Sequence, residues 1–192
     1  MATSDTKQRI LSIARGMVQA HGYNALSFRD IAQEIGIKGP AVHHHYPTKG
    51  DLGAALARAY TDDAVVLLEE LLLTSHSQRE VFDRYVAVFR AALENDNRMC
   101  LCGIMSAELA DLPEAVQVEV NRFTDVNIAW LTRLLALGGE PAPEKAPEDA
   151  RRRRALAIFT AIEGAQLVAR GHRDVAMFDR VIAAYREAGL CP

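Results

Sequence analysis

The chain lacks the features that would place it in a membrane or in a disulfide-rich class. Its 192 residues include three cysteines, an odd number that cannot all pair within one chain. No apolar run approaches the roughly 18 to 20 residues that span a bilayer, and the polar N-terminal stretch lacks the apolar segment of a signal peptide. We therefore expect a cytoplasmic protein with reduced thiols and no membrane partner.

Common catalytic patterns are also missing. The sequence has no Gly-x-Ser-x-Gly, no phosphate-binding glycine loop, no His-Glu-x-x-His and no paired cysteines at zinc spacing. It therefore predicts no catalytic residue, no metal site and no cofactor. With 49% apolar and 24% charged residues, the composition is that of a globular protein rather than a disordered chain.

Helical periodicity is what the sequence does contain. Apolar residues recur at steps of three and four, prolines and glycines separate the periodic segments, and no segment alternates like a strand. We predict an all-α fold of about nine helices. The longest break, residues 138–150, contains three prolines and two glycines and is the strongest loop candidate.

Positive charge is concentrated near the N-terminus. Residues 1–60 carry seven Lys and Arg against four Asp and Glu, so the rest of the chain carries the net negative charge. An excess of positive charge in one part of the chain favours a surface that binds a polyanion.

Residues 27–51 have the pattern of a helix-turn-helix. Ser27 and Asp30 have the spacing of a capping box, Gly36 can supply a left-handed turn, and Pro40 is tolerated in the first turn of a second helix. In this arrangement the second helix enters the major groove of DNA and the first lies across the backbone. The segment therefore predicts DNA binding.

The predicted second helix points one apolar residue, Val42, toward the core and presents polar or small residues outward. Three adjacent histidines, residues 43–45, point about 100° apart on a helix, so they do not converge on one metal ion. For His44 and His45, a structural role in packing or capping is as plausible as a DNA contact. A second capping box, Thr48 and Asp51, begins the next helix.

Residues 9–56, which include SFRDIAQEIGIKGPAVHHHYPTKGDL, resemble the DNA-binding domain of tetracycline-repressor-type (TetR family) transcriptional regulators. The resemblance implies a helix-turn-helix DNA-binding domain at residues 1–50 and a helical regulatory, ligand-binding and dimerisation domain at residues 51–192. The chain departs from the family at His43, usually tyrosine, and at Tyr46, usually phenylalanine, so the operator sequence is not transferable. The implied contacts to a double-stranded DNA operator are Ser27, Arg29, Lys38, Gly39, Ala41, His43, His44, His45, Tyr46 and Lys49.

The resemblance also implies a pocket for a small organic inducer among the inner helices. Glu108, Asn127, Glu163 and Gln166 are polar residues on apolar stripes, so each needs an internal partner, a water or a ligand. Internal hydrogen bonding is the simpler interpretation. The predicted ligand-binding residues are Cys102, Met105, Glu108, Phe123, Asn127, Trp130, Glu163 and Gln166.

The cysteines leave two interpretations open. Cys100 and Cys102 are expected to be small buried side chains, and the alternative is that they sense electrophiles or oxidants. No cation closer than Arg98 in the sequence is available to lower a thiol pKa. Cys191, beside the terminus, is expected to be exposed.

These features together predict a ligand-responsive transcriptional regulator, most simply a repressor that binds a palindromic operator as a homodimer and is released by an inducer. The alternative is a helical-bundle enzyme or adaptor without DNA binding. The homodimer is expected to form through residues 150–188. Its predicted apolar interface consists of Ala155, Ile158, Ile162, Phe178, Val181 and Tyr185.

Overall fold

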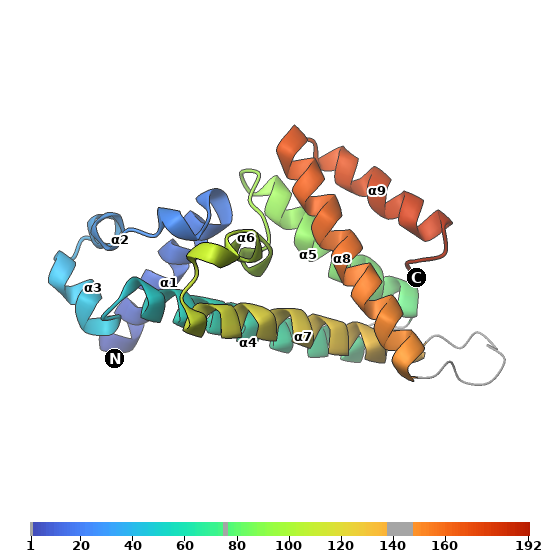
Figure 1. Ribbon diagram of the computed structural model, residues 1–192, viewed down its shortest axis with the longest axis horizontal. Coiled ribbons are helices and arrows are strands. Elements are labelled where there is room, and N and C mark those ends of the chain that lie inside the picture. The colour runs from blue at the N-terminus through green and yellow to red at the C-terminus, as the bar shows by residue number, and fades with distance from the viewer. Residues whose placement is uncertain (1, 75–76, 138–147) are drawn as a thin grey trace. The chain divides into compact units, whose positions relative to one another are not determined.

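The computed structural model describes residues 2–74, 77–137 and 148–192 (Figure 1). Within these ranges the protein consists of nine α-helices and two short 3₁₀ turns with no strand, which confirms the all-α prediction. In chain order the elements are α1 (Ala2–His21), η1 (Tyr23–Ala25), α2 (Phe28–Ile35), α3 (Gly39–His45), α4 (Lys49–Thr74), α5 (Gln78–Glu94), α6 (Leu101–Ala107), η2 (Leu109–Asp111), α7 (Glu114–Leu137), α8 (Glu148–His172) and α9 (Val175–Glu187).

The helices form two compact units. The first contains residues 1–62 and 101–123, and the second contains residues 63–100 and 124–192, so α4 and α7 each contribute to both. The domain boundary that the family resemblance implies, at residue 50, falls inside the first unit. The boundary between the compact units therefore reflects how the helices pack and differs from the expected boundary between a DNA-binding and a regulatory domain.

The first unit is built around α1. The buried residues Ile10, Ala14 and Val18 recur at four-residue spacing, and α1 packs against α2, η1 and α6. The start of α4 packs here as well, because a Cβ added to Gly53 would lie 2.7 Å from the ring of Tyr23. These contacts explain why the first unit extends into α4 and includes α6.

In the second unit α5 packs against α8 and α9, and α8 packs against α9. Tyr85 of α5 lies in its core, with 2% of its surface exposed. The ring centroid of Tyr85 is 4.9 Å from that of Trp130 and 5.3 Å from that of Phe89, so an aromatic cluster occupies this core.

The predicted homodimer interface is wrong for most of its residues. Ala155, Ile158, Ile162 and Phe178 have no exposed surface because they fill the core between α5, α8 and α9 of one chain. Val181 and Tyr185 are only partly exposed. Two apolar stripes run along α8. The stripe that contains Ala155, Ile158 and Ile162 is buried, and the second stripe is exposed. Its members are Leu156, Thr160, Gly164, Leu167, Val168 and Gly171.

Some predicted boundaries also change. Of the predicted loop, residues 138–147 lie outside the described residues, and residues 148–150 already belong to α8. Glu148 and Asp149 suit this position, since acidic side chains in the first turn interact favourably with the helix dipole. At the end of α7, Leu137 is 61% exposed and leaves the buried seam that the sequence predicts.

The predicted exposure of Cys191 is wrong, because the C-terminal segment is held against α8 and α9. The Arg154 guanidinium donates hydrogen bonds to the carbonyls of Gly189 and Leu190, and Nε of Arg186 donates to the carbonyl of Pro192. Cys191 is 5% exposed, and burial raises the pKa of its thiol.

Candidate nucleic-acid interface

The local sequence sets both ends of α2. The Ser27 side chain accepts a hydrogen bond from the N–H of Asp30 at 3.3 Å, as its capping-box position predicts. At the other end Gly36 has φ 77° and ψ 34°, the left-handed conformation that glycine adopts without a Cβ penalty. α2 therefore stops where the turn of a helix-turn-helix must begin.

The next helix, α3, is short and is held by one buried residue. Val42 has no exposed surface, as its lone apolar position predicts. After α3, the N–H of Thr48 donates to Asp51 at 3.0 Å and the N–H of Asp51 donates back to Oγ1 of Thr48 at 3.1 Å. This reciprocal capping box fixes the residue at which α4 begins after α3.

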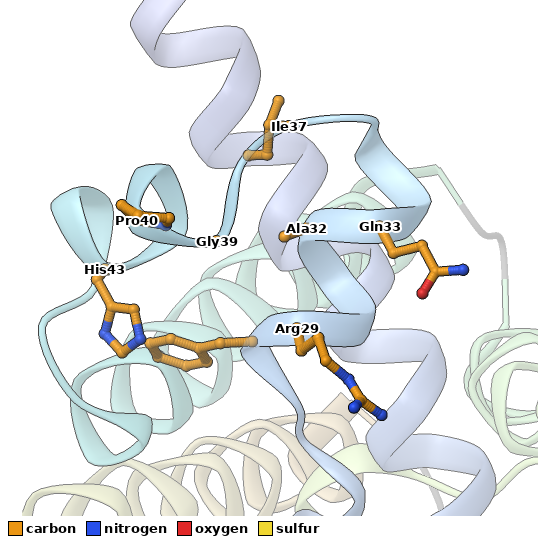
Figure 2. Close-up of a pocket in the computed structure, with 8 residues that line it drawn as sticks. Arg29, Ala32, Gln33, Ile37, Gly39, Pro40 and His43 are labelled. Carbon is orange, nitrogen blue, oxygen red and sulfur yellow. The ribbon is translucent and has the colours of Figure 1, made fainter.

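A surface groove of about 490 Å³ lies where α2 meets α3 (Figure 2). Arg29 and Gln33 project from α2 on the side away from α3, as Figure 2 shows. His43 packs on the ring of Phe28, with ring centroids 4.6 Å apart, and its Nδ1 is 3.3 Å from the carbonyl oxygen of Pro47. The residues that line the groove are Phe28, Arg29, Ala32, Gln33, Ile37, Gly39, Pro40 and His43.

Three of the ten predicted DNA contacts, Arg29, Gly39 and His43, line this groove between α2 and α3, which pack against each other. Four of the ten are exposed, and 91% of the Arg29 side chain is accessible. The exposed residues are Arg29, Lys38, His43 and His44. The partly exposed residues are Ser27, Gly39, Ala41, His45 and Lys49.

Tyr46 departs from the prediction of a DNA contact. It is 3% exposed, its hydroxyl has no hydrogen-bond partner, and burial raises its pKa to about 12. The ammonium of Lys7 lies 5.6 Å from the ring centroid. Tyr46 is therefore a core residue that supports α3. Because Val42 is the one buried residue within α3, the side chain directly after the helix is needed to hold it against the core.

Lys49 makes two contacts within the protein. Its Nζ donates to the carbonyl of Asn24 at 3.1 Å and lies 4.8 Å from the ring centroid of Tyr23. Of its three donors, one thus ties the start of α4 to the connection between α1 and α2.

Gln33 is a surface residue that sequence reasoning missed. It is exposed on α2 and follows Arg29 by four residues, so both side chains lie on one face of the helix. That spacing was visible in the sequence. An amide side chain can donate to phosphates or read base edges, so Gln33 joins the candidate contacts.

The segment α6–η2 holds the connection that leads into α2. The carboxylate of Glu108 accepts a hydrogen bond from the N–H of Tyr23, and Asp111 accepts one from the side chain of Asn24 at 2.8 Å. Gly22 has φ 88°, and a Cβ there would collide with Oε1 of Glu108. Glu108, predicted to contact a ligand, thus contacts the DNA-binding part of its own unit.

The other predicted ligand-binding residues are divided between the units. Cys102, Met105 and Phe123 are buried in the first unit, whereas the remaining four, Asn127, Trp130, Glu163 and Gln166, belong to the second. Both cysteines of the pair, at 2% exposure for Cys100 and 1% for Cys102, are buried as expected.

Three of the four residues in the second unit have internal hydrogen bonds. Asn127 accepts from the hydroxyl of Tyr85 at 2.8 Å, and Nε1 of Trp130 donates to the carbonyl of Leu68 at 2.7 Å. Gln166 accepts from the N–H of Cys100 at 2.9 Å and donates to the carbonyl of Phe89 at 2.8 Å. For these residues the simpler interpretation, internal hydrogen bonding, holds. The fourth, Glu163, has a buried carboxylate beside the thiol of Cys100, whose hydrogen bond only partly offsets the rise in pKa that burial causes.

Among residues 2–74, 77–137 and 148–192, no group of three or more His, Cys, Asp or Glu could hold a metal ion. Over the same ranges, no helix has both the length and the hydropathy to cross a membrane.

Comparisons with known proteins agree with this geometry. The family model for bacterial regulatory proteins of the tetR family matches residues 10–56. A TetR transcriptional regulator from Legionella pneumophila is 30% identical, with a TM-score of 0.86 over 95% of this chain and 96% of that one. A TetR-family regulator from Agrobacterium tumefaciens is 28% identical, with a TM-score of 0.84 over 97% and 98%.

FadR from Bacillus subtilis, solved in complex with stearoyl-CoA, has the same fold at 17% identity, with a TM-score of 0.70 over 92% of this chain and 95% of its own. No curated protein matches the chain.

The fold and the exposed face of α3 define a helix-turn-helix DNA-binding protein. The chain belongs to the TetR family of transcriptional regulators. The alternative of a helical-bundle enzyme or adaptor without DNA binding has no support in these similarities.

Proposed function

We propose that this regulator is a repressor that binds a palindromic operator as a homodimer and is released by a small organic inducer. The observation that carries the proposal is the exposed polar face of α3 beside the groove at α2. Lys38 and His44 are exposed on that face, and the small residues Gly39 and Ala41 allow the backbone to approach a base edge closely.

α2 supplies positioning contacts in this proposal. Arg29, with its 91% exposed side chain, and Gln33 lie on the flank of α2 and suit phosphates on either side of the groove that α3 enters. Phosphate contacts fix the register of a protein on the duplex, while contacts from α3 carry the sequence information.

The outward stripe of α8 supports the homodimer. Leu156, Leu167 and Val168 are each about half exposed, at 48%, 53% and 49%, and Gly164 has open space where a side chain would lie. A helix that presents apolar and small residues at spacings of three and four can pack closely against its own copy. Two helix-turn-helix units related by a two-fold axis would then contact half-sites roughly 34 to 36 Å apart, or a multiple of that distance.

The inducer part of the proposal rests on the polar groups inside the second unit, above all on Glu163. FadR, a protein of the same fold, forms a complex with stearoyl-CoA, which supports a small organic molecule as the ligand class. A ligand shifts a repressor from its DNA-bound state only by as much as it prefers the other state.

Fluorescence anisotropy on the protein's own upstream DNA tests the proposal. We expect specific binding at a Kd of about 10⁻⁸ to 10⁻¹¹ M at physiological salt and a two-fold symmetric footprint. His44→Ala should change the preference among operator variants if His44 reads a base edge. Binding to all sequences with equal affinity would contradict an operator-specific regulator.

A further inference from the structure

The imidazole ring of His43 is held by residues outside its own helix. It packs on the ring of Phe28 of α2, with centroids 4.6 Å apart and planes tilted by 57°, and its Nδ1 lies 3.3 Å from the carbonyl oxygen of Pro47, which follows α3. All three residues belong to the first unit. The ring is therefore held in one orientation although His43 is exposed.

The contact with Pro47 determines which ring nitrogen carries the proton. A carbonyl oxygen only accepts, so Nδ1 must carry a hydrogen for this contact to be attractive. In a neutral ring the other nitrogen, Nε2, is then an acceptor without a hydrogen. Among the described residues no hydrogen bond occupies Nε2 of His43, so this atom is available to a ligand.

His43 lies on the flank of α3 that faces α2. Successive helical residues are about 100° apart, so His43 is about 100° and His44 about 200° from the buried Val42. His44 is thus near the centre of the outward face, whereas His43 is turned toward the groove that it lines together with Arg29 (Figure 2). When the outward face of a recognition helix meets base edges, its flanks meet the phosphates that border the major groove.

The surroundings of His43 supply no negative charge from the groove. Of the residues that line it, Arg29 is the one with a permanent charge, and none is acidic. At the start of α4, the carboxylate of Asp51 accepts the capping hydrogen bond from Thr48, and Lys49 donates to the carbonyl of Asn24. The other titratable side chains of α3 are the imidazoles of His44 and His45. A bound phosphate would therefore be the anion that favours a positive charge on the His43 ring.

We propose that His43 binds a DNA phosphate as an imidazolium, so that the protein takes up a proton from solvent when it binds DNA. Nδ1–H remains on the carbonyl of Pro47, and Nε2–H donates to a phosphate oxygen. A neutral ring cannot make both contacts, because its Nε2 and the phosphate oxygen would both be acceptors. The inference concerns DNA binding itself and depends neither on the operator nor on the homodimer or the inducer of the proposed function.

Fluorescence anisotropy on random-sequence duplex DNA and on the protein's own upstream DNA tests the inference. Between about pH 6 and about pH 8, the Kd of the wild type should rise about tenfold more than that of His43→Gln, whose amide donates equally at every pH. The slope of log affinity against log salt should be larger by about one at pH 6 than at pH 8 for the wild type alone, since one phosphate contact depends on the proton.

His21→Gln is the matched control. His21 is an exposed imidazole at the end of α1 in the same unit, so its variant removes a titrating ring outside α3 and should keep the pH dependence of the wild type. Loss of that dependence in His44→Gln instead of His43→Gln would overturn the inference. An equal loss of affinity at every pH in His43→Gln would also overturn it, because His43 would then only support the packing of α3 on α2.

Calorimetry of DNA binding in PIPES and in Tris, buffers with different ionisation enthalpies, measures the proton directly. Near pH 7 the wild type should take up more protons per chain than His43→Gln, and equal uptake would overturn the inference. Nitrogen NMR of the free protein at pH 8 should show the hydrogen of His43 on Nδ1, and a hydrogen on Nε2 would also overturn it.

The two DNA probes separate this inference from the proposed function. Proton uptake through His43 on both probes with equal affinity would support the inference and contradict an operator-specific regulator. Specific binding to the upstream DNA without proton uptake through His43 would support the regulator and overturn the inference. A change of base preference in His43→Gln with an unchanged salt slope would assign His43 to a base edge and overturn it as well.

Discussion

The two compact units differ in the partners of their buried carboxylates and in the polarity of their exposed helix faces. In the first unit Glu119 is 7% exposed, accepts a hydrogen bond from Nε of Arg58 at 2.8 Å and lies 3.7 Å from Arg122. Glu108 of the same unit accepts the N–H of Tyr23. In the second unit the carboxylate of Glu163 has only the thiol of Cys100 beside it, and no cation of the described residues contributes to its pKa.

The outer surfaces differ in the reverse sense. The exposed side of α3 carries polar residues that water solvates well, whereas the exposed side of α8 carries Leu156, Leu167 and Val168. The first unit therefore pairs its buried carboxylate Glu119 with arginine and offers a polar surface to DNA. The second unit instead leaves a buried carboxylate without a cation and an apolar stripe on its surface, and the second subunit of the proposed homodimer would cover that stripe.

The largest expected effect comes from the outer face of the second unit. Gly164→Glu should leave the folded monomer intact, because no atom lies within 4 Å of where its Cβ would be. It should also place a charge inside the proposed homodimer interface. We expect a monomer in sedimentation and a loss of operator affinity on the order of 1,000-fold, since each monomer then reads only half a site.

Val66→Glu is the matched control, because Val66 is a 69% exposed helical residue of the same unit outside the stripe. It should remain dimeric and bind the operator like the wild type. Dimers of Gly164→Glu with unchanged operator affinity would place the interface on another face.

The second effect concerns the pH dependence of stability. The folded-state pKa of Glu163 is raised from 4.5 to about 7, so its proton is bound more tightly in the folded chain. The stability it contributes is present below about pH 4.5 and is lost as the pH rises through about 7. The wild type should therefore lose about 3 kcal/mol of unfolding free energy relative to Glu163→Gln between about pH 5 and about pH 8.

Urea unfolding of the two proteins at both pH values measures this difference. Parallel pH dependence of wild type and Glu163→Gln would mean that the carboxylate has a donor or a hydrated environment in solution.

The third effect concerns the connection between α1 and α2 in the first unit. Gly22, at φ 88° and ψ 174°, has a backbone conformation that is essentially restricted to glycine, and a Cβ would displace the Glu108 carboxylate. Gly22→Ala should lower the unfolding free energy by about 2 to 3 kcal/mol. Gly36→Ala, with open space and a milder left-handed conformation, should lower it by about 1 kcal/mol.

A double-mutant cycle isolates the contribution of Glu108. If the Cβ that Gly22→Ala introduces collides with the carboxylate, this substitution should be less destabilising in a Glu108→Ala background. Additive effects of the two substitutions would assign the whole cost to backbone strain.

Local rules explain why the helix-turn-helix could be predicted from the sequence. The capping boxes at Ser27 and at Thr48, and the left-handed Gly36, involve residues at most three apart, so their spacing is visible in the chain. The burial of Val42 could likewise be predicted, because it is the main apolar side chain of its helix. The exposed face of α3 follows from these few residues.

Long-range contacts explain what could not be predicted. Glu108 and Tyr23 are 85 residues apart, and no periodicity in the sequence indicates that they meet. α8 carries two apolar stripes, and only the packing of α5 and α9 shows that the stripe of Ile158 is internal. Tyr46 and Lys49 were predicted as DNA contacts from the family resemblance, whereas their partners Lys7 and Asn24 lie elsewhere in the chain.

The smallest expected effect distinguishes two lysines of the DNA-binding surface. Lys38 is exposed at the start of α3, whereas Lys49 already donates to the carbonyl of Asn24. Lys38→Ala should weaken binding on all sequences about equally and reduce the slope of log affinity against log salt by about one, since one phosphate contact is lost. Lys49→Ala should reduce that slope by less and also lower the Tm, because its ammonium links α4 to the connection between α1 and α2. Anisotropy titrations at several salt concentrations, together with thermal unfolding, measure both. A full unit of slope lost in Lys49→Ala with an unchanged Tm would show that its ammonium leaves Asn24 for a phosphate when DNA binds.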